Sequence, residues 1–165
     1  MSAARALIAG VGQPWMRDLA FGCHVVRRLR DTGRPRGVDV LDLSFGAVAA
    51  VQLLRDQPYR RAVFVTARAG GRRRGRLYER RECAVARGPE EVQAHIADAL
   101  MGSVSLETLL IVWTHFGTLP AEVRVIEVEP ADETWGPDLS PAVDRLVERA
   151  AGRAIRAARR NVELC

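Results

Sequence analysis

A short apolar segment that runs directly into a glycine-rich turn constrains the fold of this chain more than any other feature. Residues 5–9 (RALIA) have the pattern of a buried β-strand, Gly10 and Gly12 follow at once, and a helical pattern begins at Phe21. In α/β proteins such a turn follows a parallel strand, and its glycines allow the backbone to approach a ligand. The sequence therefore predicts an α/β protein with its candidate site at this turn.

The turn lacks the signatures of a nucleotide site. Its spacing is Gly10-x-Gly12-x-x-Trp15, so an indole stands where a dinucleotide-binding turn has a third glycine that packs the helix closely on the sheet. A phosphate-binding loop would end in Gly-Lys-Ser or Gly-Lys-Thr, and the chain contains no lysine. Nucleotide binding at this turn is therefore not expected.

Strand-like and helix-like segments alternate along the whole chain. Apolar runs and alternating patterns predict strands at 7–11, 38–43, 62–67, 75–81 and 123–129, the fourth of them as an edge strand. Apolar residues at helical spacing predict helices at 21–30, 46–54, 89–101 and 106–113, and a long last helix that begins at the Ser140-Pro141 pair. With right-handed crossovers, this order predicts a single domain over residues 1–165, a three-layer α/β/α fold with a mostly parallel twisted sheet.

Composition excludes several classes of protein. The 165 residues are 48% hydrophobic and 27% charged, which is typical of one globular domain with a proper core. No apolar run reaches the roughly 18–20 residues that span a bilayer, and no apolar signal segment follows Met1, so we expect a cytoplasmic protein without a membrane partner. Cys23, Cys83 and Cys165 form no Cys-x-x-Cys pair and are expected to be reduced thiols.

All 25 basic residues are arginine, the net charge is +5, and the densest cluster lies at 72–81. Such a cluster could attract nucleic acid or an acidic partner. Arginine is scattered through the whole chain, however, and few aromatic residues accompany it for base stacking. Nucleic-acid binding is therefore not expected, and the arginine-rich segment is interpreted as a solvated loop that partly faces a partner.

The order and spacing of the elements resemble those of the nickel-iron hydrogenase maturation proteases, endopeptidases that remove the C-terminal extension of the hydrogenase large subunit. Three segments carry the resemblance, which covers nearly the whole chain: the turn at 10–22, the strand at 38–42 with the helix at 47–54, and the stretch at 128–147. The resemblance implies the phosphorylase/hydrolase-like fold of that family. It also implies a protein partner, the large-subunit precursor.

The resemblance implies three metal-ligand positions, and this chain departs from the family at each of them. The first follows Asp18 and is Leu19, and the second, at the end of the third strand, is Ala67. The third, a histidine that opens the helix before the last strand, falls at Met101 or Gly102. Divalent metals need carboxylate or imidazole donors, which these residues lack. We therefore expect no bound metal and no other cofactor, and nickel would arrive only within the substrate.

Asp18 and Asp42 remain as candidates for a polar or catalytic site, because they follow adjacent parallel strands. The candidate substrate groove around them comprises Gly10, Gly12, Gln13, Trp15, Ser44 and Trp135. Other possible donors are His24, His95, Asp98, Glu107 and His115, for which the sequence shows no catalytic pairing. Trp113, like the other two indoles, is a candidate interface anchor, and packing in the core or in a lid is the alternative.

Three functions are consistent with these observations. The loss of donors at three positions favours a catalytically degenerate maturation factor, which binds the hydrogenase large-subunit precursor without cutting it. The first alternative is an active endopeptidase with an altered site at Asp18 and Asp42, acting on a precursor that carries the nickel. The second alternative is a fold recruited as a subunit of an unrelated assembly.

Overall fold

A computed structural model describes residues 5–57, 59–83, 87–102, 104–117 and 119–160 of the chain. Its centre is one five-stranded sheet with the strand order β2-β1-β3-β5-β4. The strands span Arg5–Gly10 (β1), Val38–Asp42 (β2), Tyr59–Ala67 (β3), Leu77–Glu82 (β4) and Glu122–Val128 (β5). All neighbouring pairs are parallel except β4 with β5, which is antiparallel. The predictions of a mostly parallel sheet and of an edge strand after residue 75 are confirmed.

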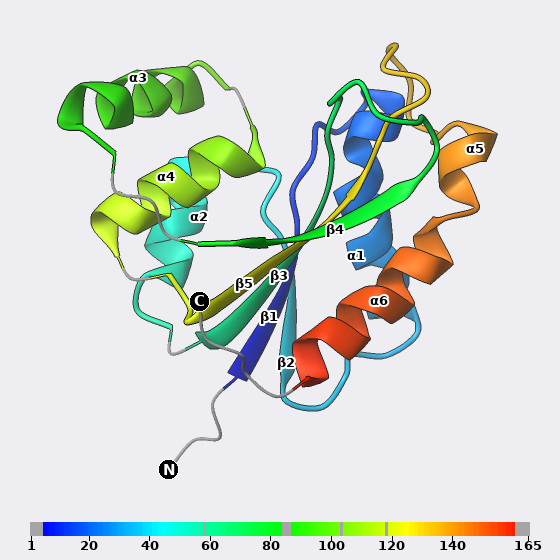
Figure 1. Ribbon diagram of the computed structural model, residues 1–165, viewed down its shortest axis with the longest axis horizontal. Coiled ribbons are helices and arrows are strands. Elements are labelled where there is room, and N and C mark those ends of the chain that lie inside the picture. Colours follow the sequence, from blue (N-terminus) through cyan, green and yellow to red (C-terminus); the bar gives the residue numbers. More distant parts are fainter. Residues whose placement is uncertain (1–4, 58, 84–86, 103, 118, 161–165) are drawn as a thin grey trace.

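Helices cover both faces of the sheet (Figure 1). They span Arg17–Ala20 (η1, a 3₁₀ turn), Phe21–Asp31 (α1), Ala47–Leu54 (α2), Pro89–Leu100 (α3), Leu106–Phe116 (α4), Pro141–Asp144 (α5) and Val147–Arg159 (α6). Side chains alternate between the faces of each strand, so Ile8 and Val65 pack with α1 and α6, whereas Leu7 and Phe64 pack with α2 and α4. α3 lies outside α4 and buries only Val92. This is the predicted three-layer architecture.

Glycines in the first turn serve the packing of α1 on the sheet. A Cβ at Gly10 would lie 2.3 Å from the carbonyl oxygen of Gly22, and a Cβ at Gly22 would lie 2.3 Å from that of Val65. β1, β3 and the start of α1 therefore approach to a distance that only glycine allows. Gly10, expected in the substrate groove, is instead a buried packing position.

The last helix differs from the prediction, because it is divided into α5 and α6. The Leu146 N–H donates to the carbonyl of Val143, only three residues back, so the chain tightens between the two helices. Ser140 stands at the predicted N-cap position, but its hydroxyl donates to Asp18 rather than capping the helix. A tertiary contact has thus replaced the local one.

A buried ion pair fastens α6 to the amino end of the sheet. The Arg61 Nε lies 2.9 Å from the Glu122 carboxylate, and both side chains are at most 3% exposed. The same guanidinium donates to the carbonyl of Ala157, 3.0 Å away, in the last turn of α6. Carbonyls at a helix end have no donor within the helix, so Arg61 satisfies one of them.

No helix in the described part of the chain is long and apolar enough to cross a bilayer. Cys23 is a buried free thiol, as expected. Cys83 is disulfide-bonded, so the expectation of a reduced thiol is wrong at that position. Cys165 lies outside the described residues.

Candidate functional site

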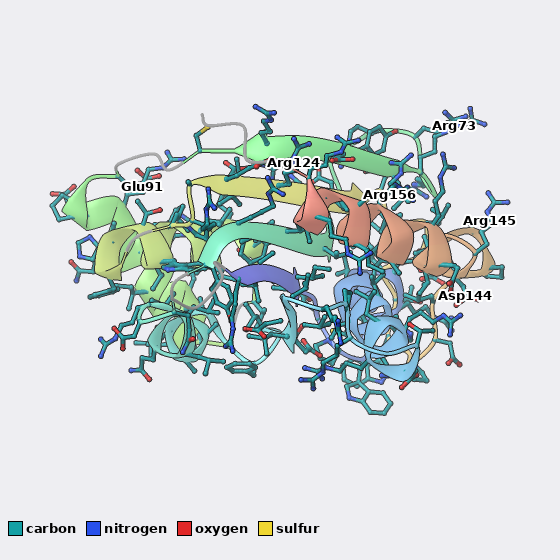
Figure 2. The ribbon with its side chains drawn as sticks, turned by 90° about the horizontal axis from the view of Figure 1, so that it is seen from below. Arg73, Glu91, Arg124, Asp144, Arg145 and Arg156 are labelled. Atoms are coloured by element: carbon teal, nitrogen blue, oxygen red, sulfur yellow. The ribbon has the colours of Figure 1, made fainter. Side chains whose placement is uncertain are left out.

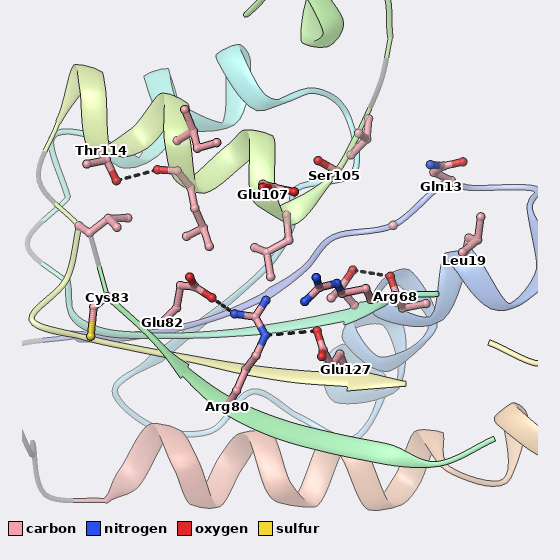
Figure 3. Close-up of a pocket in the computed structure, with 18 of the residues that line it drawn as sticks. Gln13, Leu19, Arg68, Arg80, Glu82, Cys83, Ser105, Glu107, Thr114 and Glu127 are labelled. Atoms are coloured by element: carbon pink, nitrogen blue, oxygen red, sulfur yellow. Dashed lines mark hydrogen bonds and ion pairs between the residues drawn. The ribbon is translucent and has the colours of Figure 1, made fainter. Parts of the chain in front are cut away.

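A pocket of about 330 Å³ opens beyond the carboxyl ends of β1 and β3 (Figure 3). The turn after β1 contributes Gly12 and Gln13, two of the residues named for the substrate groove, and β3 contributes Thr66 at its end. Strand β4 forms another wall, and the start of α4 forms a third. The carboxyl ends of parallel strands are the usual ligand-binding edge of an α/β sheet, so this pocket is the candidate site.

Two of the three implied ligand positions come together in this pocket. Leu19 of η1 and Ala67 at the end of β3 both line it. Met101 and Gly102 do not, because they terminate α3, and the Met101 side chain is 88% exposed. The helix before β5 is α4, whose N-cap is Ser105.

The assignment of the third position to Met101 or Gly102 is therefore corrected. Ser105 and Glu107, at the start of α4, line the pocket together with Leu19 and Ala67. The prediction is wrong because α3 and α4 are consecutive helices, and Met101 and Gly102 follow the end of the first, whereas Ser105 precedes the start of the second. Of the other donors considered from the sequence, only Glu107 lines the pocket.

The pocket does not provide a ligand set for a divalent metal. Within the described ranges, no three His, Cys, Asp or Glu side chains gather in a geometry that could hold an ion. The pocket carboxylates of Glu82 and Glu127 are both paired with Arg80, and Arg72 lies 2.6 Å from the second of them. With Leu19 and Ala67 supplying no donor, the residues present do not fit a metal centre.

Part of the arginine-rich segment is structural. Arg72 pairs with Glu127 and Glu129, and its guanidinium lies 4.1 Å from the centre of the Tyr78 ring. Burial alone raises the pKa of Glu129, but hydrogen bonds from the Gly70 backbone, Arg72 and the Gly71 backbone outweigh it and hold that pKa below its ordinary value. Arg73, in contrast, extends from the surface (Figure 2). The interpretation as a solvated loop is thus wrong for Arg72.

Asp18 is completely buried, and its carboxylate is saturated. Oδ2 accepts hydrogen bonds from the backbone N–H groups of Ala131 and Asp132 and from the Ser140 hydroxyl, and Oδ1 accepts one from the Ser140 N–H, all at 2.8 Å. Four donors fill the acceptor positions of a carboxylate. Asp18 therefore fastens the loop after β5 to η1, and it does not line the pocket.

Asp42 is likewise engaged by its own neighbourhood. Its Oδ1 accepts from the Ser44 N–H at 3.0 Å, and the Ser44 hydroxyl accepts from the Gly12 N–H at 3.0 Å. The same hydroxyl lies 3.1 Å from the Cys23 thiol, whose pKa is raised by burial. Neither Asp42 nor Ser44 lines the pocket, although Ser44 supports the turn that does.

The three indoles divide into one core residue and two surface residues. Trp113 is 1% exposed and meets Phe64 edge to face, with ring centres 6.3 Å apart. Trp15 and Trp135 are 57% and 73% exposed. Both lie outside the pocket lining, on loops that are hydrogen-bonded to each other. The core explanation is confirmed for Trp113 alone.

Comparison with solved structures gives consistent matches along the chain. The hydrogenase 2 maturation peptidase from Thaumarchaeota archaeon SCGC_AB-539-E09 is 28% identical, with 93% of this chain and 97% of that chain covered and a TM-score of 0.64. The hydrogenase maturating endopeptidase HybD from E. coli is 21% identical, with 94% and 92% covered and a TM-score of 0.70. HycI from Thermococcus kodakarensis KOD1, a [NiFe] hydrogenase maturation protease, is 19% identical, with 96% and 95% covered and a TM-score of 0.63.

No protein-family model matches the chain, and no curated protein matches it significantly. The structural matches nevertheless cover more than nine tenths of both chains in each of the three comparisons. They extend over every layer of the fold rather than over a common βαβ unit. The chain therefore has the fold of the hydrogenase maturation proteases, and its resemblance to that family is confirmed at the level of structure.

Proposed function

We propose that this protein is a catalytically degenerate maturation factor, which binds the nickel-iron hydrogenase large-subunit precursor and does not cleave it. The observation that carries the proposal is the pocket lining, where Leu19 and Ala67 stand beside Arg68 and Arg80. The similar solved structures are described as maturation proteases, which supports a protein substrate or partner of the same kind. We also expect the protein to act in the cytoplasm.

The positive charge in the pocket opposes the binding of a metal cation. Figure 3 shows the Arg68 side chain extending into the cavity, and no ion pair to this guanidinium is found among the described residues. At an effective dielectric constant of about 20, two like unit charges about 4 Å apart repel by about 4 kcal/mol, and a divalent ion doubles that figure. Of the three glutamates that line the pocket, Glu82 and Glu127 are already paired with Arg80, and Glu107 is the third.

The altered endopeptidase is the weaker candidate, because the two carboxylates on which it depends have other functions. Asp18 accepts four hydrogen bonds in the interior, and Asp42 holds the turn at Ser44. A general base needs a free lone pair within reach of its substrate. Asp18 has none.

A processing assay tests the proposal. Purified protein is mixed with the nickel-loaded large-subunit precursor from the same organism, while binding is measured by calorimetry and the precursor C-terminus is followed by mass spectrometry. We expect binding without any change of mass. The variant Ala67→Trp, which fills the pocket, should weaken binding at least tenfold, about 1.4 kcal/mol. The matched control Ala97→Trp, at an exposed position of α3, should leave it unchanged.

Cleavage by the wild-type protein would overturn the degenerate assignment. If that cleavage disappeared in Asp42→Ala, the altered endopeptidase would be established instead. Absence of both binding and cleavage would reject the precursor as the partner and support recruitment into another assembly.

A further inference from the structure

We propose that a second surface, outside the pocket, docks a cationic segment of a partner protein. This indole surface consists of Trp15, Trp135 and the acidic residues Asp132, Glu133 and Asp138, from the loops after β1 and β5. Both indoles are more than half exposed, at 57% and 73%. Indole side chains are enriched among the anchor residues of protein interfaces, and neighbouring exposed apolar side chains that are rimmed by polar residues mark interaction sites. The proposal does not depend on the identity of the partner.

The two loops form one rigid platform. Met16 and Gly136 make a parallel β-bridge, in which the Gly136 N–H donates to the Trp15 carbonyl at 2.7 Å and the Arg17 N–H donates to the Gly136 carbonyl at 3.1 Å. Each indole directly precedes a residue of this bridge. Asp18 holds the same two loops together from below with four hydrogen bonds. A surface already fixed in this way loses little conformational entropy when a partner binds.

The backbone that presents Trp15 is strained. Trp15 has φ 67° and Arg17 has φ 40°, the only non-glycine residues with positive φ among those described. The left-handed region costs a bulky residue about 1–3 kcal/mol, and such strain persists where the surrounding structure enforces it at functional positions. Glycine would relieve the strain at position 15 without disturbing the bridge, because the bridge uses only backbone groups. In this strained conformation, the Trp15 indole is exposed to solvent.

Charge specifies the chemistry of the occupant. The segments 12–20 and 131–140 carry four carboxylates and one cation, Arg17, in a chain whose net charge is +5. Arg17 is already paired with Asp132 at 3.5 Å, which leaves Glu133 and Asp138 exposed beside Trp135. Arginine or lysine on a partner would gain both ion pairing with these carboxylates and cation–π contact with the indole faces. An acidic segment would be repelled.

A peptide titration on the full-length protein tests this. The probes are an acetylated, amidated peptide of alternating arginine and leucine and a second peptide with glutamate in place of arginine. Quenching of tryptophan fluorescence reports binding, because Trp15 and Trp135 are exposed while Trp113 is buried and gives a constant background. We expect the arginine peptide to bind at least about tenfold more tightly than the glutamate peptide. Its affinity should fall severalfold between low and physiological salt.

Variants distinguish binding at the indole surface from nonspecific binding to exposed apolar side chains. Trp135→Ala and Trp15→Gly should each lower the affinity for the arginine peptide at least about fivefold, as expected for a lost cation–π contact. Phe116→Ala removes an aromatic side chain of similar exposure on α4 and should have no effect. Unchanged unfolding midpoints would show that the variants are folded. Equal binding of the two peptides, no binding at millimolar concentration, or full affinity in both tryptophan variants would overturn the proposal.

Discussion

Removing the Asp18 carboxylate should destabilise the protein strongly, although Asp18 is not placed to do chemistry. In Asp18→Ala, the N–H groups of Ala131, Asp132 and Ser140 lose their acceptor in the interior. Each buried donor left without a partner costs about 1–3 kcal/mol, and water that enters the space recovers part of this. We therefore expect the free energy of unfolding to fall by about 3–5 kcal/mol. Asp18→Asn keeps one carbonyl oxygen for the three donors to Oδ2 and should lose about 2 kcal/mol.

Urea unfolding followed by circular dichroism measures these losses, and amide hydrogen exchange locates them. Protection of the Ala131, Asp132 and Ser140 amides should collapse in Asp18→Ala while that of the central strands falls only with global stability. Ser140→Ala is the matched control, because it removes one hydroxyl donor and should cost only about 1 kcal/mol. A loss below 1 kcal/mol in Asp18→Ala, with these amides still protected, would refute the reasoning.

Three further predictions concern other buried groups. Arg61→Met leaves the buried Glu122 with one arginine fewer and should lower the free energy of unfolding, measured in urea, by about 3 kcal/mol. An unchanged free energy of unfolding would contradict the pairing. Burial raises the pKa of Glu122, but its arginines outweigh this and hold that pKa below its ordinary value. Its stabilisation is therefore present above about pH 4.3 and is lost as pH falls through the lowered pKa, so the acid side of the stability profile should be flatter in Arg61→Met. Gly10→Ala should cost at least about 3 kcal/mol by the same measurement, since the added Cβ meets backbone atoms, whereas Gly88→Ala has open space and should be neutral. Because burial raises the pKa of Cys23, a thiol reagent at pH 8 should label it at least about 100-fold more slowly in the native state than in urea, and equal rates would show that the thiol is accessible.

The layers of this fold were predictable because they depend on local patterns. The run at 62–67 is apolar on both faces and lies in the central strand β3, while the alternating, charged segment at 75–81 overlaps the edge strand β4. The break between α5 and α6 was not predictable. It accompanies the contact of Ser140 with Asp18, which lies 122 residues away in the sequence.

The site was predictable only in its outline. Leu19 and Ala67 could be recognised as apolar replacements, and both line the pocket. The arginine network was missed, because Arg72 and Arg80 meet Glu127 only through the order of the strands. One signal was nevertheless available, since a glutamate within a fully buried strand requires a cation, and the densest arginine cluster of the chain was the obvious source.

The adjacent residues Asp18 and Leu19 have different roles, since Asp18 supports the loops around the site and Leu19 lines the pocket itself. Leu19 projects into the pocket and is half-buried, so its substitution changes what the pocket can bind without unbalancing any hydrogen bond. Asp18 joins η1 to the loop at 131–140, and these two segments carry the pocket wall at Leu19 and the indole at Trp135. Polar substitutions at Leu19 should therefore alter precursor binding at constant stability. Substitutions at Asp18 should weaken binding at the pocket and at the indole surface together, because they release the loop that links both.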